Sequence, residues 1–331
     1  MSETAAGGQR AGSRALSLFT NPLNADVLRA HLGGPQRLFG VQAALGPVAE
    51  STVRAAIANL CEVGALVRED DGSSSRAAVT SLTAGGRELL FLADEIDVWL
   101  ALAPTGPIEP GSEEAKGAIK ALAGGWSSTL IRELAGSPVT LSELNEAIPE
   151  VSYPQLERRI NWMRRTGQIE PRRRDGRGTP YVVTDWLRRA IAPLSVSGRC
   201  ERLHIDDSSP ITEVEIEAAF LMSIPLALLP THSTGTCLLA AQTDPRQADP
   251  PTAPLAGVTV EVGRGEVLSC GSSLVSAPPT WAVGSPGAWL DAVIEGEIVD
   301  LRIGGADPQL ALDLVAGLHA ALFLDRRELA Q

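Results

Sequence analysis

The chain has 331 residues, of which 44% are hydrophobic, 21% are charged and only 4% are aromatic, and its formal net charge is −12. This length indicates two or three domains, and the apolar content excludes a broadly disordered protein. The best candidate for a membrane span, Ala218 to Leu229, contains Pro225 and is shorter than the ~20 residues that a span requires. The first residues lack the charged and apolar segments of a signal peptide, so we expect a cytoplasmic protein with no membrane partner.

The residue patterns of common catalytic and metal sites are missing from the sequence. The cysteines form no C-x-x-C pair and the histidines no H-x-x-x-H spacing; they are Cys61, Cys200, Cys237, Cys270, His31, His204, His232 and His319. There is also no phosphate-binding Gly-Lys-Ser/Thr loop and no G-x-S-x-G elbow. We therefore predict no metal, no cofactor and no enzyme activity.

The charge is distributed unevenly along the chain. Between Glu150 and Ala190 ten arginines stand against five carboxylates, a local net charge of +5. From Cys200 to the last residue the net charge is −12. A basic block in an acidic chain is either a solvated surface or the contact site for an anionic partner such as double-stranded DNA.

An internal repeat is the most informative pattern in the sequence. Residues 21–67 superpose on residues 124–170 without a gap, at an offset of 103. Glycine, proline and arginine coincide, as in the pairs Arg29/Arg132, Pro35/Pro138 and Gly64/Gly167, and the apolar positions keep the same rhythm. We conclude that the chain carries two copies of one module.

The second copy indicates what the module is. Residues 126–135 have helical spacing and end at Gly136, and Thr140 with Glu143 forms the capping-box pattern at the start of a short helix. Ser152 begins a third helix that buries Leu156, Ile160 and Met163. Two short strands joined by an arginine-rich tip follow, ending in Tyr181-Val182-Val183. Three helices and a hairpin predict a winged helix-turn-helix, whose third helix enters the DNA major groove.

These residues resemble HxlR-type winged-helix regulators over about residues 112–193, and more loosely over residues 14–104. The motifs that carry the resemblance are Gly125-Trp126, Ile131-Arg132-Glu133-Leu134, Leu141-Ser142-Glu143-Leu144, Gly167 before the basic strand, and Tyr181-Val182-Val183-Thr184. The resemblance implies a bacterial transcription regulator of a kind that usually acts as a dimer. We expect either a homodimer or an intramolecular pseudo-dimer of the two modules.

The candidate DNA-binding residues lie on the third helix and the wing of the second module. Arginine and glutamine can bond base edges, and both can bind phosphate. The candidates are Tyr153, Gln155, Arg158, Arg159, Trp162, Arg165, Arg172, Arg173, Arg174 and Arg177. A merely solvated basic face remains the alternative.

The first module is expected to contribute little to DNA affinity. Its third helix, about residues 49–63, exposes mostly small residues, and its wing tip, residues 69–76, is rich in carboxylates that repel phosphate. A long apolar helix, residues 87–102, follows it and serves either domain packing or dimerisation. We place a disordered tail at residues 1–13, the two modules at residues 14–104 and 112–195, and a Pro/Gly-rich spacer from Pro104 to Gly111 between them.

Residues 200–331 form an acidic α+β domain in this interpretation. We predict strands at residues 237–241, 258–262, 266–270 and 280–283, and helices at residues 213–229 (interrupted at Pro225), 286–294 and 308–323. The stretch from Gly284 to Ala311 is similar to the closing part of sterol-carrier-protein-like domains. This similarity implies an apolar cavity, for which the candidate ligand-binding residues are Phe220, Met222, Trp281, Trp289 and Phe323. They could equally be plain core, and the domain could serve protein contacts instead.

The predicted architecture is multidomain α+β, with two tandem winged helix-turn-helix domains followed by an α+β ligand-binding-like domain. The expected function is DNA-binding transcription regulation, with the last domain sensing a small apolar or aromatic ligand. A ligand acts only if it favours one arrangement of the modules over another. The alternative is a protein that binds or sequesters a natural product in self-resistance and uses the winged helices as a scaffold.

Overall fold

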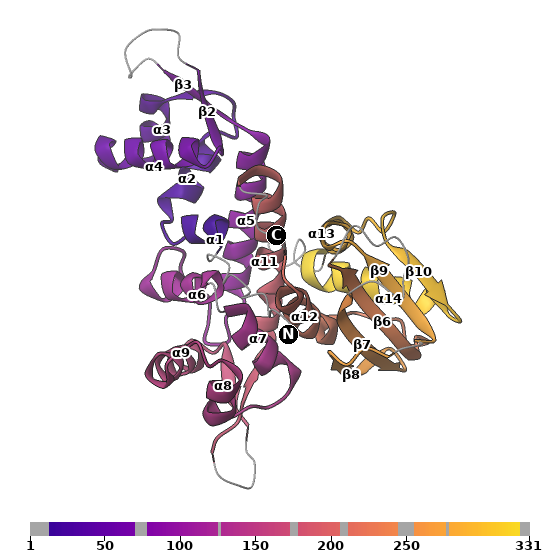
Figure 1. Cartoon of the computed structure of the whole chain (residues 1–331). Helices are drawn as coiled ribbons and strands as arrows, with labels where there is room; N and C mark the ends of the chain where they lie inside the picture. The colour runs from indigo at the N-terminus through magenta and orange to yellow at the C-terminus, as the bar shows by residue number, and fades with distance from the viewer. Residues whose placement is uncertain are drawn as a thin grey trace, which may run out of the picture.

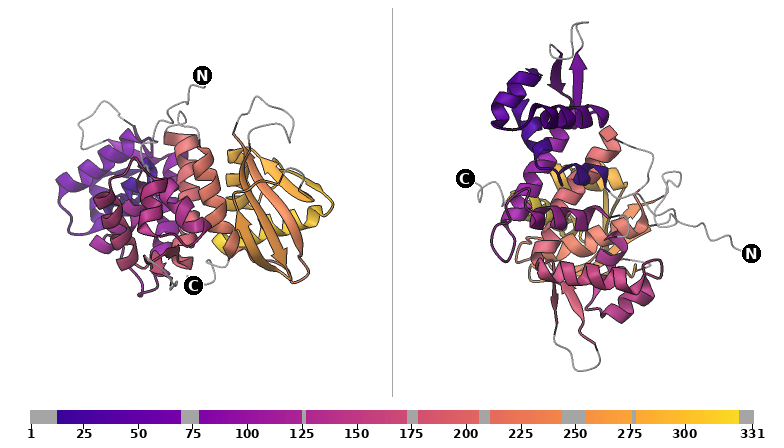
Figure 2. Two further views of the ribbon diagram at one scale, coloured as in Figure 1. Left: turned by 60° about the horizontal axis from the view of Figure 1, so that its bottom comes forward. Right: turned by 90° about the vertical axis from the view of Figure 1, so that its left-hand side faces the viewer.

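The computed structural model describes residues 13–69, 78–124, 127–172, 178–205, 211–243, 255–275 and 278–324. Helices and strands are mixed throughout these residues, which confirms the predicted α+β class (Figure 1). Two mainly helical units stand one above the other in Figure 1, and a five-stranded sheet lies to one side of them. The two further views show the same arrangement (Figure 2). Among the described residues, no helix combines the length and the apolar character needed to cross a membrane.

The first unit begins with short helices and ends in a long one. Its sheet has the strand order β1-β3-β2. The elements are α1 (Arg14–Leu18), α2 (Leu23–Ala30), β1 (Gln36–Arg37), α3 (Leu38–Leu45), α4 (Glu50–Glu62), β2 (Leu66–Glu69), β3 (Val79–Leu82) and α5 (Ala84–Ala101). Ser13, which we expected in the disordered tail, instead caps α1 because its hydroxyl accepts a bond from the Leu16 N–H. Residues 1–12 lie outside the described residues.

The second unit repeats this order and begins with a longer counterpart of α1. Its elements are α6 (Glu113–Ala123), α7 (Ser127–Gly136), α8 (Leu141–Ala147), α9 (Tyr153–Arg165), β4 (Ile169–Pro171), β5 (Tyr181–Val183), α10 (Asp185–Arg189), α11 (Ile191–Cys200) and a π-helix, η1 (Glu201–Ile205). The predicted boundary between residues 195 and 200 therefore falls inside a continuous helical segment.

The two units have the same order of elements, and up to the hairpin they match at the offset found in the sequence. Helix α9 begins and ends 103 residues after α4. In the first unit Gln36 pairs with Thr80, and in the second Val139 pairs with Tyr181 in the same antiparallel manner. Gly64 and Gly167 follow α4 and α9 with φ angles of 74° and 75°, a left-handed conformation that favours glycine. The repeat is therefore structural as well as sequential.

The units share one apolar core around α5 and α11. A continuous cluster of buried side chains extends from Leu16 in the first unit to Leu130 and Leu156 in the second. The segment from Pro104 to Gly111 does not act as a free spacer, because Ile108 is buried and its N–H donates to the Leu100 carbonyl at 3.1 Å. The one large apolar side chain of this segment thus fixes it to the core, which corrects the spacer prediction.

The last part of the chain forms a sheet with helices on one face. Its elements are α12 (Glu213–Ser223), the 3-10 helix η2 (Ile224–Leu226), β6 (Gly235–Gln242), β7 (Leu255–Gly263), β8 (Glu266–Gly271), β9 (Thr280–Gly284), α13 (Pro286–Glu295), β10 (Arg302–Gly305), α14 (Pro308–His319) and the π-helix η3 (Ala320–Leu324). The strand order is β10-β9-β6-β7-β8, with β6 and β9 parallel. Alternate residues of β6, such as Cys237 and Leu239, pack against the helices. Strands and helices are present where we predicted them, but α12 ends at Ser223 and α14 at His319, earlier than predicted, and β10 was not predicted.

Candidate nucleic-acid interface

Helix α9 is held in place by its apolar side and by a capping box. Leu156, Ile160 and Met163 are buried in the shared core. At the start of the helix the Gln155 carbonyl oxygen accepts bonds from the Ser152 N–H at 3.2 Å and the Ser152 hydroxyl at 2.8 Å. Such a cap satisfies backbone groups that the first turn leaves unpaired. The residues of α9 itself therefore determine which side of the helix faces solvent; we call this side its outer face.

The outer face of α9 carries exposed cations without acidic partners. Arg158, Arg164 and Arg165 are exposed, as is Arg172 just beyond β4. Tyr153, 45% exposed, stands at the start of the helix. Within the described part of the chain these four arginines form no ion pair, and Arg158 Nε donates only to the Pro154 carbonyl of its own helix at 3.2 Å. Their charge is available to an anion in solution.

Two predicted DNA-binding residues are turned toward the protein instead. A guanidinium N–H of Arg159 donates to the Ala121 carbonyl of α6, and burial lowers the pKa of Arg159 to about 10. The indole of Trp162 covers Gly117 of α6 so closely that an added Cβ there would lie 2.2 Å from the ring. Both residues were expected on an open face. Helix α6 lies outside the repeated segment, and it covers this side of α9.

Gln155 also has a more restricted role than predicted. Its carbonyl oxygen is engaged in the cap, so only its amide N–H groups remain for a contact outside the chain. Bidentate recognition of adenine uses both ends of the amide and would break the cap. The wing-tip candidates Arg173, Arg174 and Arg177 lie outside the described residues.

The corresponding face of the first unit is nearly neutral. The exposed residues of α4 include those predicted, namely Ser51, Thr52, Arg54, Ala55, Ala58 and Glu62, and also Asn59. At the offset of 103, Arg158 corresponds to Ala55 and Arg165 to Glu62. Arg54 forms an ion pair with Glu50 one turn earlier. The first unit therefore offers little net positive charge along this helix.

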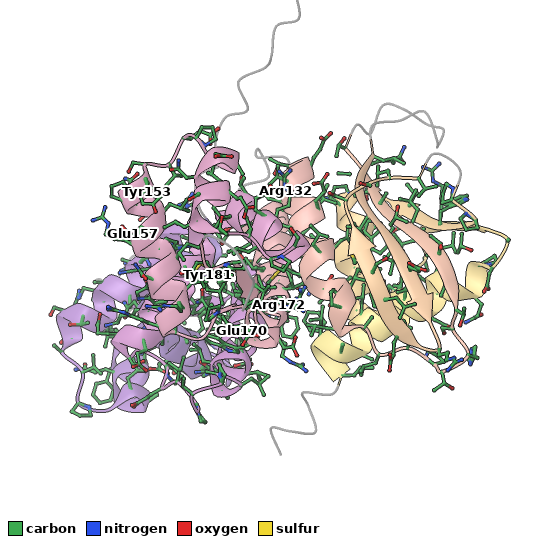
Figure 3. All side chains as sticks on the ribbon, turned by 90° about the horizontal axis from the view of Figure 1, so that it is seen from below. Arg132, Tyr153, Glu157, Glu170, Arg172 and Tyr181 are labelled. Carbon is green, nitrogen blue, oxygen red and sulfur yellow. The ribbon has the colours of Figure 1, made fainter. Side chains whose placement is uncertain are left out.

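The acidic domain does not lie over α9. Figure 1 shows α4 and α9 on the side of the molecule opposite the sheet, and Figure 3 shows Tyr153 and Glu157 facing away from it. The domain instead packs α12 against α7. Arg132 of α7 lies at this contact, with its Nη1 3.4 Å from Glu217 Oε2 of α12. The outer face of α9 is open on the side away from the sheet.

Two arginines of the basic block hold the third domain. Arg188 Nη1 donates to the Leu221 carbonyl at 2.6 Å, at the end of α12, and Arg189 Nη1 lies 3.5 Å from the Ala321 carbonyl. Cations are stabilised at the carboxyl ends of helices, where backbone carbonyls are unpaired. These two charges are structural rather than part of the exposed basic face.

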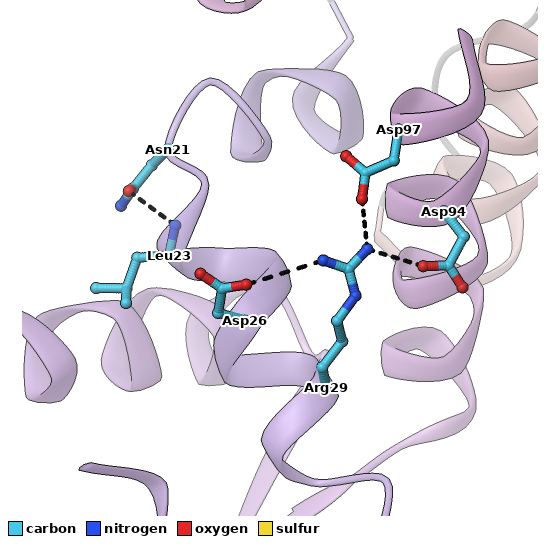
Figure 4. Close-up of polar contacts among 6 residues, drawn as sticks. All are labelled: Asn21, Leu23, Asp26, Arg29, Asp94 and Asp97. Carbon is cyan, nitrogen blue, oxygen red and sulfur yellow. Dashed lines mark hydrogen bonds and ion pairs between the residues drawn. The ribbon is translucent and has the colours of Figure 1, made fainter. Parts of the chain in front are cut away.

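A pair of equivalent arginines has diverged between the units. Arg29, the counterpart of Arg132, contacts three carboxylates, with Nη2 at 2.9 Å from Asp94 and 2.6 Å from Asp97, and Nη1 at 3.8 Å from Asp26 (Figure 4). Burial opposes the charge of Arg29, but the bonds to Asp94 and Asp97 outweigh it and raise the pKa. In the first unit this position ties α2 to α5, whereas in the second it ties α7 to α12.

Two of the five predicted ligand residues meet at a cavity. Phe220 and Trp289 pack edge to face with ring centroids 4.8 Å apart and line a cavity of about 90 Å³. Met222 is fully buried in the shared core, and Phe323 packs near Phe91 with centroids 6.3 Å apart. Trp281 covers Gly304 of β10. The structure thus separates Met222, Phe323 and Trp281 from the cavity that Phe220 and Trp289 share.

Possible metal ligands do not cluster in the described residues, and the pKa of each of the four cysteines is raised by burial. No group of three or more His, Cys, Asp or Glu side chains there could hold a metal ion. Burial raises the pKa of Cys200, Cys237 and Cys270 to about 12, so these thiols stay protonated near neutral pH and are poor nucleophiles. No protein-family model and no curated protein sequence matches this chain.

Proposed function

We propose that this protein is a DNA-binding transcription regulator whose α9 enters the major groove. The observation that carries the proposal is the group of exposed guanidiniums of Arg158, Arg164, Arg165 and Arg172, which form no ion pair among the described residues of an otherwise acidic chain. Clustered arginines supply the phosphate contacts on which DNA affinity depends. Tyr153 and the amide N–H groups of Gln155 stand where the first turn of a recognition helix contacts base edges.

The element order supports two tandem winged-helix domains of HxlR type. Each unit has a helix, a short extended segment that pairs with the hairpin, two further helices and the hairpin, in the order that the winged helix-turn-helix requires. The two hairpins extend toward opposite ends of the molecule, and α4 and α9 lie on one side (Figure 1). The chain is then an intramolecular pseudo-dimer that places both helices on one duplex. The charges make its contact asymmetric, with α9 binding strongly and α4 weakly.

The third domain is the ligand sensor in this proposal. It joins the DNA-binding units through α12 on α7 and through Arg188 and Arg189, so a change in its position reaches the second unit directly. The similarity of its last part to sterol-carrier-protein-like domains agrees with the order of β9, α13, the turn at Asp307 and α14. A small apolar or aromatic ligand is the expected effector.

The test is selection of duplexes from a random-sequence library, followed by binding isotherms at several salt concentrations. We expect a selected duplex to bind, and the R158Q/R164Q/R165Q variant to lose at least tenfold in affinity. The matched control is R264Q, which removes an exposed arginine from the turn between β7 and β8. Failure to select any duplex, or equal affinity of the triple variant and the control, would overturn the proposal. A chain that binds apolar ligands but no duplex would instead fit a sequestering protein.

A further inference from the structure

Gln155 caps α9 through only one end of its amide. Its carbonyl oxygen accepts bonds from the Ser152 N–H at 3.2 Å and from the Ser152 hydroxyl at 2.8 Å. A backbone N–H can only donate, so the amide atom that it contacts has to be the oxygen. Gln155 is exposed, and its NH2 group has no hydrogen-bond partner among the described residues. Two N–H donors at the start of α9 are therefore open to a partner in solution.

Two other helices form the same cap with glutamate. At the start of α8, one Glu143 oxygen accepts bonds from the Thr140 N–H at 2.7 Å and the Thr140 hydroxyl at 2.8 Å. At the start of α12, one Glu215 oxygen accepts bonds from the Thr212 N–H at 2.8 Å and the Thr212 hydroxyl at 3.0 Å. Of the capping boxes in the described part of the chain, only that of α9 uses glutamine. The cap itself therefore does not require an amide.

A carboxylate would stabilise the first turn of α9 better than an amide does. Negative charge near the start of a helix is favoured by the helix dipole, and the capping boxes of α8 and α12 both provide it. The first turn of α9 contains no acidic residue. The stability of the cap therefore does not explain why position 155 is glutamine. Glutamine differs from glutamate in having no charge and in donating, rather than accepting, at its outer end.

The neighbours of Gln155 favour a contact with DNA. Arg158 lies three residues later on the same side of the helix, and its Nε donates to the Pro154 carbonyl at 3.2 Å. A carboxylate at position 155 would pair with this guanidinium and repel the phosphates that Arg158 can bind. Glutamine leaves that charge available. In the first unit the equivalent positions are Thr52 and Ala55, so the combination of amide and arginine belongs to the second unit.

An amide that can only donate distinguishes the four bases from one another. In the major groove guanine presents two adjacent acceptors, O6 and N7. Adenine presents one acceptor beside a donor, thymine one acceptor beside a methyl group, and cytosine a donor. The usual pairing of glutamine with adenine needs the amide oxygen, which Ser152 already bonds. Only guanine offers an acceptor to each of the two free N–H groups.

We propose that Gln155 determines which base α9 recognises, and that it selects guanine rather than adenine. This inference rests on the proposed function, because it assigns one base of the duplex that α9 contacts. The arginines supply affinity for phosphate irrespective of sequence, whereas Gln155 reads a base edge. Contacts of this kind favour the correct base by roughly tenfold or more.

The deciding variant is Q155E, with duplexes selected separately for the wild type and the variant. Q155E keeps an oxygen for the bonds from Ser152, as Glu143 and Glu215 do in their caps, but its outer end accepts instead of donating. Glutamate accepts a bond from cytosine N4. We therefore expect one position of the selected motif to change from guanine in the wild type to cytosine in Q155E, while the other positions stay the same. Base preferences are compared, because the added charge weakens binding to every duplex.

The matched control is E215Q, which makes the reverse exchange in the capping box of α12. We expect it to select the same motif as the wild type. The melting temperature of Q155E is expected to equal or exceed that of the wild type, because the cap is kept and the added charge is favoured at the start of the helix. A lower melting temperature would show that the Gln155 oxygen is not engaged in the cap, and the inference would then be wrong.

Modified bases test the two acceptors directly in the duplex selected by the wild type. We expect 7-deazaguanine, which lacks N7, to weaken binding at least threefold at one guanine of the motif. Inosine, which keeps O6 and N7, is expected to leave binding at that guanine unchanged. If Q155E selects no duplex, the result with 7-deazaguanine decides the inference.

The outcomes separate this inference from the proposed function. If the wild type and Q155E select the same base at every position, or if the position that changes is not guanine in the wild type, the inference is overturned and the proposed function stands. Binding that tolerates 7-deazaguanine at every guanine of the motif also overturns the inference alone. If the wild type selects no duplex, the proposed function fails and the inference fails with it.

Discussion

Trp99 and Trp186 exchange hydrogen bonds with each other's backbone. The indole Nε1 of Trp99 donates to the Trp186 carbonyl at 2.9 Å, and that of Trp186 donates to the Trp99 carbonyl at 2.7 Å. Their rings are stacked with centroids 4.8 Å apart and planes 9° apart. Trp99 lies on the helix that follows the first repeated unit and Trp186 on the helix that follows the second. This reciprocal contact joins the two units at the centre of the shared core and makes them one body.

The first prediction concerns this contact. Trp186→Phe keeps an aromatic ring but removes one of the two donors, so the Trp99 carbonyl keeps only its bond to the Leu102 N–H. We expect a loss of about 1–2 kcal/mol in the free energy of unfolding, measured by urea denaturation. The matched control is Trp281→Phe, because within the described chain the Trp281 indole donates no hydrogen bond. If Trp281→Phe lowered the free energy of unfolding as much as Trp186→Phe, the exchanged bonds would not explain the loss of stability.

The second prediction compares adjacent arginines of α9. Arg158→Ala removes an exposed cation and is expected to reduce the slope of log affinity against log salt by about 1, with little effect on stability. Arg159→Ala removes the bond to the Ala121 carbonyl and the packing against α6. We expect it to lower the free energy of unfolding by about 1–3 kcal/mol and to leave the salt slope unchanged. Equal salt slopes for the two variants would show that α9 does not contact DNA through this face.

The repeat was predictable from the sequence because local signals define it. Gly64 and Gly167 end equivalent helices in the left-handed conformation, and the pair Thr140 and Glu143 forms the expected capping box. These signals act within a few residues and keep their spacing when a unit is duplicated. The ends of α4 and α9 and the start of α8 follow from them.

The parts of the site that sequence alone missed depend on distant segments. Arg159 and Trp162 are covered by α6, which lies outside the segment that repeats in the sequence, and nothing local marks that contact. Elsewhere in the fold, the Ser13 hydroxyl donates to the Glu201 carboxylate across almost the whole length of the first two units, and no local pattern predicts that bond. Strand β10 was missed because Arg302-Ile303-Gly304-Gly305 is half glycine, and its pairing with β9 overrides that weak propensity.

The third prediction concerns the attachment of the third domain to α5. Arg199 is 7% exposed and bridges two helices, with Nη1 at 2.6 Å from Glu295 of α13 and Nη2 at 3.1 Å from Glu88 of α5. Burial disfavours its charge, but the bonds to the two carboxylates outweigh this and raise the pKa of Arg199. We expect Arg199→Met to lower the free energy of unfolding by about 2–3 kcal/mol. This is less than the loss on breaking a fully buried ion pair, because Glu295 is half exposed.

Arg29→Met is the control for this prediction. Arg29 contacts more carboxylates than Arg199, but its side chain is 37% exposed, so solvent screens the pairs and the expected cost is below about 1 kcal/mol. Urea unfolding in low salt and in 0.5 M NaCl (a concentration that shortens the screening length to roughly 4–5 Å) measures both variants. If R29M lowered the free energy of unfolding more than R199M, the number of ion pairs rather than their burial would determine stability here.

The last prediction is a pH dependence that arises at His31. This side chain is buried, its Nδ1 bonds the Val27 carbonyl at 2.7 Å, and its Nε2 lies 2.8 Å from the Thr80 hydroxyl of β3. Burial lowers the pKa of His31 and outweighs the opposing bond to Val27. Below about pH 6.5 the unfolded chain therefore binds a proton that the folded chain does not, so the free energy of unfolding decreases as the pH falls.

Urea midpoints at pH 7.5 and 5.5 measure this effect. The decrease between the two pH values is expected to be smaller in His31→Gln than in the wild type, even though the variant is less stable at both. His232→Gln is the control, because His232 is 75% exposed. Glu217, whose pKa is raised by burial, acts in the opposite direction, but it is present in all three proteins and cancels in the comparison. An identical decrease in H31Q and the wild type would show that His31 does not couple the hairpin of the first unit to pH.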